Sequence, residues 1–182
     1  ITLNAFLNFG LSAVLIEPAV KLLEGRGASV RLGHELRALV TSGDRVNELN
    51  FGDDKIALGP DDTVILAVPP RPAASLLPGL KTPTKFRAIV NAHFRIDPPR
   101  GAAPILGVVG GLVEWLFAFP QRLSVTISNG DRLIDMPREE LAQAIWRDVC
   151  KAGGVSGDLP PWQIVRERRA TFEATPEQNA LR

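Results

Sequence analysis

The apolar run from Thr63 to Val68, which Pro69 and Pro70 end abruptly, constrains the fold of this chain more than any other feature. No polar residue alternates along the run, and this pattern is typical of a strand that is covered on both faces. Proline has no N–H to donate to a neighbouring strand, so the ladder of hydrogen bonds must end there. The run therefore predicts a buried strand whose end is placed accurately against another part of the protein.

Glycines and prolines divide the rest of the chain into short periodic segments. Helical spacing predicts helices over residues 4–16, 18–24, 72–77 and 137–151. In the last of these, Leu141, Ile145 and Val149 form an apolar stripe that is typical of a core-facing helix. Strand patterns cover residues 28–33, 36–40, 46–51, 56–58, 86–96, 105–109, 112–119, 123–128 and 162–169. The succession predicts an α+β fold, mainly antiparallel sheet with a few packed helices.

Composition excludes several classes of function. The net charge is +1, with 21 basic and 20 acidic residues, so we expect no nucleic-acid partner. A single cysteine, Cys150, excludes an internal disulfide and provides no metal-binding spacing. The longest apolar segment, Leu11 to Ile16, is too short to span a bilayer and does not resemble a signal peptide. The chain opens on Ile1, and its only methionine is Met136, which predicts an interior piece of a longer protein. A cytoplasmic location is also expected.

The sequence contains no recognisable catalytic motif. It has no P-loop, and Gly25-Arg26-Gly27 follows a predicted helix rather than a strand, so it is not a dinucleotide fingerprint. The two histidines, His34 and His93, lie far apart and are interpreted as structural residues rather than catalysts. Cys150 is interpreted as an inert thiol. The catalytic residues therefore remain unknown, and the chain is not expected to be an enzyme on its own.

Aromatic residues recur at alternate positions of the segment Leu112 to Phe119. Trp115, Phe117 and Phe119 must then share one face of a strand. Two interpretations remain open, namely a sheet face packed under helices and the wall of a cavity for a long apolar ligand. Phe94 and Trp162 fit either interpretation.

Five segments in this order resemble one protein family: GASVRLGHELRALV, DDTVILAVPPRPAASLLPGL, FRAIVNAHFRID, GLVEWLFAF and RERRATFEATPEQNALR. They are similar to the squalene-associated FAD-dependent desaturases, also described as hydroxysqualene dehydroxylases, within the flavin amine oxidase and phytoene desaturase superfamily. The resemblance implies an FAD-dependent oxidoreductase that converts hydroxysqualene to squalene in hopanoid biosynthesis. Carotenoid or phytoene desaturases and amine oxidases of the same superfamily stay open as alternatives, as does a non-catalytic domain for lipid binding or association.

The resemblance also implies roles for particular residues. Residues 1–80 would belong to the FAD-binding half and residues 81–182 to the substrate domain. A strand from Val30 to Leu36 would meet the adenine moiety of FAD, and the buried run would end beside the cofactor. Trp115 and Phe117 would be walls for a long isoprenoid substrate. The implied cofactor-binding residues are Glu35, Leu36, Ala67, Val68 and Pro69.

Two cofactor-binding segments of the family are missing from this sequence. The family's glycine-rich fingerprint precedes the region that this chain resembles, and its Gly-Asp flavin segment follows it. Because both are absent from the sequence, we expect the isolated chain to retain little FAD. We also expect self-association, with Leu3 to Ile16 as the contact surface, and peripheral membrane contact is left open.

Overall fold

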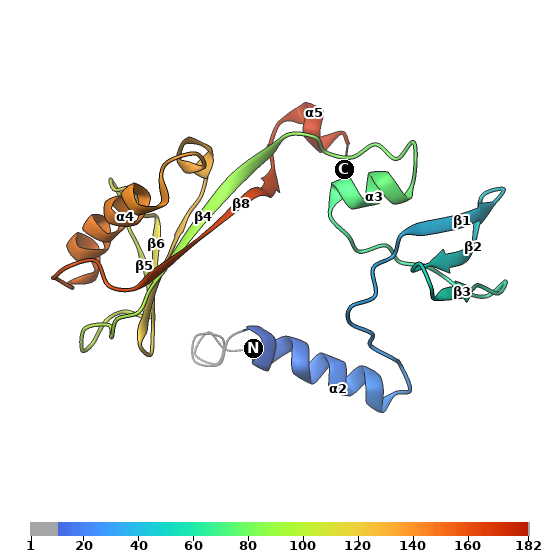
Figure 1. Ribbon diagram of the computed structural model, residues 1–182, viewed down its shortest axis with the longest axis horizontal. Coiled ribbons are helices and arrows are strands. Elements are labelled where there is room, and N and C mark those ends of the chain that lie inside the picture. The colour runs from blue at the N-terminus through green and yellow to red at the C-terminus, as the bar shows by residue number, and fades with distance from the viewer. Residues whose placement is uncertain (1–10, 182) are drawn as a thin grey trace. The chain divides into compact units, whose positions relative to one another are not determined.

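The computed structural model describes residues 11–181, which form two compact units (Figure 1). One unit comprises residues 86–173 with residues 11–21, and the other comprises residues 22–85 with residues 174–181. The sequence-based boundary after residue 80 falls in the segment that precedes the first strand of the larger unit. The assignment of the two parts to cofactor and substrate stays a prediction.

The larger unit is built on a five-stranded antiparallel sheet with the strand order β5-β6-β7-β4-β8. Its strands are β4 (Phe86–Phe94), β5 (Ile105–Gly107), β6 (Trp115–Phe119), β7 (Arg122–Ile127) and β8 (Trp162–Phe172). All five were expected from the sequence, although β8 is longer than predicted. The antiparallel sheet confirms the predicted α+β class.

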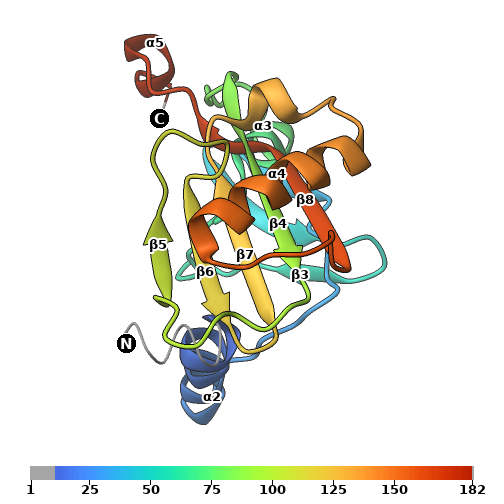
Figure 2. The same cartoon turned by 90° about the vertical axis from the view of Figure 1, so that its left-hand side faces the viewer.

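Helix α4 (Arg138–Gly153) lies across one face of this sheet (Figure 2). Its predicted stripe of Leu141, Ile145 and Val149 is fully buried, and α4 is preceded by the short 3₁₀ helix η2 (Gly130–Leu133). Pro137 is the N-cap residue and Gly154 ends the helix in the left-handed region, which glycine adopts without strain. On the sheet side the core is formed by alternate strand residues, among them Val90, Phe94, Leu116, Val125 and Ile164.

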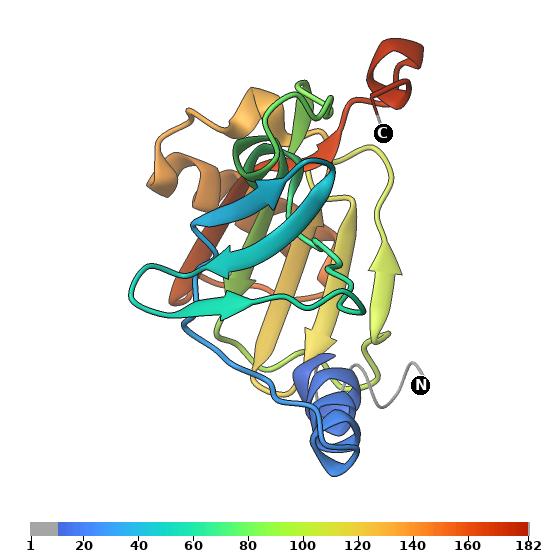
Figure 3. The same ribbon diagram turned by 90° about the vertical axis from the view of Figure 1, so that its right-hand side faces the viewer.

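The smaller unit contains a three-stranded antiparallel sheet, shown in Figure 3, and two short helices. The strands are β1 (Ala38–Ser42), β2 (Arg45–Asn50) and β3 (Lys55–Ala57), and the helices are α3 (Pro70–Leu76) and α5 (Pro176–Asn179). The predicted hairpin is present, and Gly43 takes a φ of 61° at the first position of its two-residue loop. Helix α5 was not predicted, and it positions Gln178 to accept hydrogen bonds from the backbone N–H groups of Thr84 and Lys85 at 2.7 and 2.9 Å.

The first helical region differs from the prediction of two helices separated before Pro18. A π-helical segment, η1 (Ser12–Ile16), runs directly into α2 (Glu17–Gly25). Proline cannot donate the backbone hydrogen bond of a regular turn, and the Glu17 N–H bonds instead to the carbonyl of Ser12, five residues back. Residues 4–10 of the predicted helix lie outside the described residues.

Two predicted strands are wrong. Residues 28–33 and 63–68 form no strand, and Leu32 and Ile65 are 88% and 86% exposed. The pattern in the sequence describes what a strand would bury, but a strand also needs a neighbour to accept its backbone hydrogen bonds. The described residues supply no such neighbour for either segment, so both stay irregular and exposed.

Candidate functional site

The face of the five-stranded sheet opposite α4 carries two rows of paired residues, and we call it the open face. Residues that pair directly across antiparallel strands point to the same side of the sheet. The first row runs from β8 to β5 through Gln163, His93, Ser124, Phe117 and Ile105. The second row runs through Val165, Asn91, Thr126, Trp115 and Gly107.

Strand β6 supplies an aromatic strip to the open face. Trp115 is 47% exposed, and its ring lies above Gly107, where a Cβ atom would come within 3.5 Å of the indole. The rings of Phe117 and Phe119 stack with centroids 6.4 Å apart, and the guanidinium of Arg122 lies 4.4 Å from the centroid of Phe119. The strip thus offers aromatic surface that α4 does not cover.

Strands β7 and β4 supply a polar strip beside the aromatic one. The Nδ1 atom of His93 lies 2.9 Å from the Oγ of Ser124, a side chain that is almost fully buried. One row away, the hydroxyl of Thr126 donates a hydrogen bond of 2.7 Å to Oδ1 of Asn91. The open face therefore places two hydrogen-bonded pairs directly next to two large aromatic rings.

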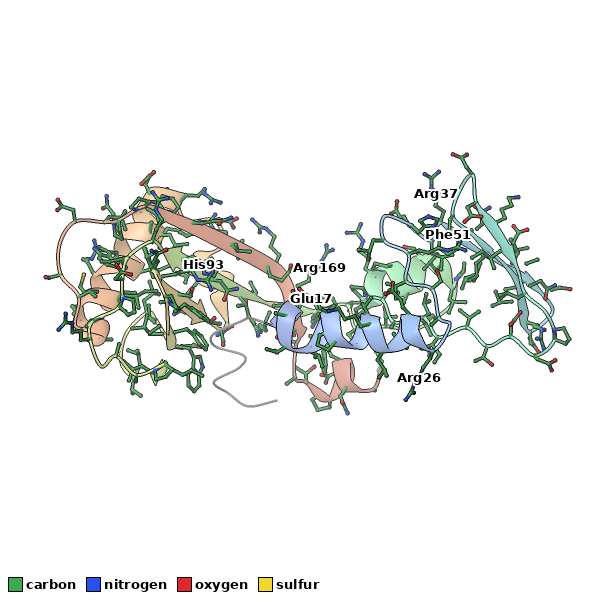
Figure 4. All side chains as sticks on the ribbon, turned by 90° about the horizontal axis from the view of Figure 1, so that it is seen from below. Glu17, Arg26, Arg37, Phe51, His93 and Arg169 are labelled. Atoms are coloured by element: carbon green, nitrogen blue, oxygen red, sulfur yellow. The ribbon has the colours of Figure 1, made fainter. Side chains whose placement is uncertain are left out.

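The polar strip continues into an open pocket of about 490 Å³ at one end of the sheet. Figure 4 labels His93 on β4, in the unit that contains this pocket. Burial and the nearby positive charge of Arg122 lower the pKa of His93 below its usual value, so its ring is neutral near pH 7. The lining residues are His93, Phe94, Arg95, Pro120, Gln121, Arg122, Pro161, Trp162 and Gln163.

Phe94 and Trp162, whose surroundings the sequence left open, contact the core beside α4. Phe94 is fully buried and lies 5.1 Å from Trp146 of α4, measured between ring centroids. Trp162 packs against the same core and also borders the pocket. Trp115 and Phe117 lie on the opposite side of the sheet. They are therefore not packed under α4.

The residues expected to contact FAD lie in the smaller unit, in segments without regular structure. Glu35, Ala67, Val68 and Pro69 are exposed, and Leu36 is half-buried. Pro69 is the N-cap residue of α3, a helix of seven residues. Two of the first three residues of α3, Pro70 and Pro72, have no N–H to offer a phosphate. The described residues alone therefore do not form a binding site for FAD.

The polar residues of the open face were not identified from the sequence as candidate site residues. Asn91, Ser124 and Thr126 were not singled out, and His93 was interpreted as structural. Their signal is the alternation of polar and apolar residues along β7 and at Asn91 and His93 of β4, but only the strand pairing shows that these positions meet. Among residues 11–181, no three His, Cys, Asp or Glu side chains are grouped as metal ligands would be. No helix in that range has the length and apolar character needed to cross a bilayer.

Comparison with known proteins identifies the family. The profile described as "Flavin containing amine oxidoreductase" matches residues 3–182. Hydroxysqualene dehydroxylases from Sinorhizobium fredii and Rhodopseudomonas palustris are 80% and 70% identical over 95% of this chain, and one from Zymomonas mobilis is 43% identical over 94%. The chain spans 42% of the length of each of these relatives.

A solved structure supports the fold. The chain is similar to the crystal structure of a protein assigned as a protoporphyrinogen oxidase from Exiguobacterium sp. 255-15, with a TM-score of 0.61 and 17% identity. This similarity covers 88% of the present chain and 40% of the other. The resemblance noted in the sequence is confirmed, and the chain belongs to the flavin-containing amine oxidoreductase family.

Proposed function

We propose that this chain is part of an FAD-dependent oxidoreductase that acts on a squalene-type isoprenoid, removing the hydroxyl group of hydroxysqualene. The observation that carries the proposal is the aromatic strip of Trp115, Phe117 and Phe119 on the open face. The names of the three similar dehydroxylases support the substrate class. In the intact protein the flavin would supply the redox chemistry, while this chain supplies part of the substrate-binding surface.

Trp115 and Phe117 suit a long hydrocarbon chain for a simple physical reason. Transfer of apolar surface out of water contributes about 25 cal/mol per Å², and flat aromatic rings provide much of this surface with few rotatable bonds. Rings held on a sheet are positioned more rigidly than rings on loops, so they can hold a flexible substrate in one register. We assign this role to the larger unit, in keeping with the expected substrate domain of residues 81–182.

For the cofactor, we propose that Glu35, Leu36, Ala67, Val68 and Pro69 approach FAD in the full-length protein, where residues 1–80 would form part of the FAD-binding half. The exposure of Glu35, Ala67 and Val68 supports this assignment, because the backbone groups of exposed irregular segments can pair with a ligand. Pro69 differs, since it has no N–H and its carbonyl already accepts a hydrogen bond from Ala73. The isolated chain is expected to retain little FAD. A cytoplasmic location with peripheral membrane contact stays a prediction.

The test uses the full-length protein that contains this chain. We expect the purified protein to be yellow with bound flavin and to form squalene from hydroxysqualene when a reductant is supplied. Trp115→Ala should raise KM for hydroxysqualene about tenfold, because part of the apolar contact surface is lost. Trp146→Phe is the matched control on the α4 side, and it should lower the melting temperature while leaving KM unchanged.

Two outcomes would contradict the proposal. One is a full-length protein that binds flavin but forms no squalene from hydroxysqualene. The other is an unchanged KM in a folded Trp115→Ala variant, which would remove the aromatic strip from the substrate site. The 182-residue chain serves as the cofactor control, and stoichiometric flavin on it after desalting would contradict the expected weak binding.

A further inference from the structure

We propose that His93 and Ser124 bind the hydroxyl group of an otherwise apolar substrate, and that this pair makes the site selective for the hydroxylated molecule over the plain hydrocarbon. The inference rests on the proposed function, because it assigns a specificity-determining role within the same site. It starts from the pairing of the two residues across β4 and β7 and from the 2.9 Å distance between Nδ1 and Oγ.

The hydrogen-bonding capacity of His93 is only partly used. Its Nδ1 atom is paired with Ser124, and among the described residues its Nε2 atom has no hydrogen-bond partner. In a neutral imidazole one ring nitrogen donates and the other accepts, and a hydroxyl such as that of Ser124 can adapt to either arrangement. The free nitrogen can therefore pair with an alcohol, which is itself both a donor and an acceptor.

His93 also borders a space that a ligand could occupy. His93 lines the pocket of about 490 Å³, whereas Ser124 lies behind it and is almost fully buried. Ser124 also pairs with Phe117 on β6, so His93, Ser124 and Phe117 stand in one row of the open face. A hydroxyl at His93 would thus leave its carbon chain beside the aromatic strip.

The charges around His93 favour a neutral hydroxyl over a cationic group. Arg122 and Arg95 border the same pocket, and Gln163 on β8 is the uncharged neighbour in the row. Burial and Arg122 hold the pKa of His93 down, so the ring stays neutral and able to accept or donate one hydrogen bond. The arginines disfavour a positively charged amine, which is the substrate expected if the chain belonged to the amine oxidases left open by the sequence.

Selectivity follows from the cost of leaving a partly buried polar group unpaired. A hydrocarbon that filled the same volume would displace water from His93 without replacing its hydrogen bond. A site built to bind a hydroxyl discriminates strongly against the analogue that lacks it. For a dehydroxylation this has a useful consequence, because the product loses the group that the pair holds and is released more easily.

The experiment compares equilibrium binding of hydroxysqualene and squalene to the full-length protein in one detergent. We expect the wild type to bind hydroxysqualene about ten- to hundredfold more tightly than squalene. His93→Phe and Ser124→Ala should reduce this ratio toward one, mainly by weakening hydroxysqualene binding. His93→Gln, which keeps a donor and an acceptor, should restore part of the ratio.

Ser75→Ala is the control, since it removes a side-chain hydrogen bond, from Oγ to the carbonyl of Arg71, outside the open face. It should leave the ratio unchanged. An equal loss of selectivity in Ser75→Ala, or an unchanged ratio in a folded His93→Phe or Ser124→Ala variant, would overturn the inference. A wild type that prefers hydroxysqualene but does not convert it would contradict only the proposed function, whereas one that converts it without preferring it would contradict only this inference.

Discussion

At the scale of single residues, the three tryptophans illustrate how side-chain surroundings decide the effect of a substitution. Trp146 of α4 is buried, its ring is tilted against that of Phe94, and it donates its indole N–H to the carbonyl of Gly157 at 3.1 Å. Trp115 is half-exposed on the open face. Trp162 is intermediate in exposure, and the guanidinium of Arg138 lies 5.8 Å from the centroid of its ring. The same residue type thus occurs in three different environments.

These environments predict different losses of stability. Trp146→Ala should lower the free energy of unfolding by about 3–5 kcal/mol, because it leaves a large cavity in the core. Trp115→Ala should cost about 1 kcal/mol, since much of its ring already contacts solvent. Chemical denaturation of both variants checks the difference. Equal losses would place Trp115 in the core and leave its proposed role at the substrate without support.

His93 should contribute to the dependence of stability on pH. Its pKa is lowered in the folded state, first by burial and then by Arg122, whereas the unfolded chain should protonate near the usual value of 6.5. As the pH falls below that value, the unfolded state binds a proton that the folded state resists, so stability decreases. The contribution is fully present above about pH 6.5 and is lost toward lower pH, over the window between the two pKa values.

Replacing His93 by glutamine removes this titration. The melting temperature of wild type minus that of His93→Gln should fall as the pH is lowered from about 7 to about 5. Gln143→Ser is the control, because it changes an exposed position without an ionisable group and should leave the wild-type pH dependence intact. A difference for His93→Gln that is constant across this range would contradict the expected effect.

At the scale of elements, Asp148 connects α4 to the chain that enters β6. Its carboxylate accepts hydrogen bonds from the backbone N–H of Leu112 and, at 3.3 Å, from that of Val113. Gly111 allows this approach, because a Cβ atom there would lie only 2.7 Å from Oδ2 of Asp148. The helix thus fixes the loop that leads to the aromatic strip.

Removing the carboxylate should loosen that loop. Asp148→Ala leaves two backbone N–H groups without their acceptor, which should lower the free energy of unfolding by about 1–3 kcal/mol. Arg147→Ala, at the exposed neighbouring position, should change it by less than about 0.5 kcal/mol. Hydrogen exchange at Leu112 and Val113 provides a second readout, and unchanged protection there in Asp148→Ala would contradict the assigned contact.

The elements that the sequence predicted correctly are those whose neighbours lie within the described chain. In β4, every second residue from Ala88 to Phe94 is buried in the core, so the alternation in the sequence corresponds to a real interior. Residues 63–68 show an equally clear apolar pattern but have no strand beside them, and Ile65 is exposed. The apolar periodicity of a segment indicates which side chains would be buried in a strand. Whether the strand forms depends on hydrogen bonding to a segment elsewhere in the chain.

At the scale of the whole molecule, the smaller unit exposes apolar side chains over several segments. Leu22, Val30, Leu32, Ile65 and Val68 are all solvent-exposed. Exposed apolar surface of this kind tends to associate, and a second copy of the chain presents the same surface. The surface predicted from the sequence was Leu3 to Ile16. Residues 3–10 of it lie outside the described residues, and Leu11, Leu15 and Ile16 in the remainder are exposed.

We therefore predict that the isolated chain self-associates as its concentration rises. Light scattering should show a mass above 19.7 kDa, and Leu32→Ser combined with Ile65→Ser should shift the population toward the monomer. Gln143→Ser, on the exposed side of α4, is the control. A core-packed residue such as Leu106 would not serve, because its replacement would also affect folding. A monodisperse monomer at high concentration would refute the prediction.

The sequence by itself determined the family, the α+β class, a helix over residues 137–151 and the shared face of Trp115, Phe117 and Phe119, because each depends on local spacing or on matching segments. Only the tertiary structure decided that His93 meets Ser124 and that Asn91 meets Thr126. These contacts join residues 31 and 35 positions apart, and they exist only because β4 pairs with β7 in one particular register. A shift of that register by one residue would turn every polar side chain of β7 to the α4 side, and nothing in the local pattern of either strand specifies the partner.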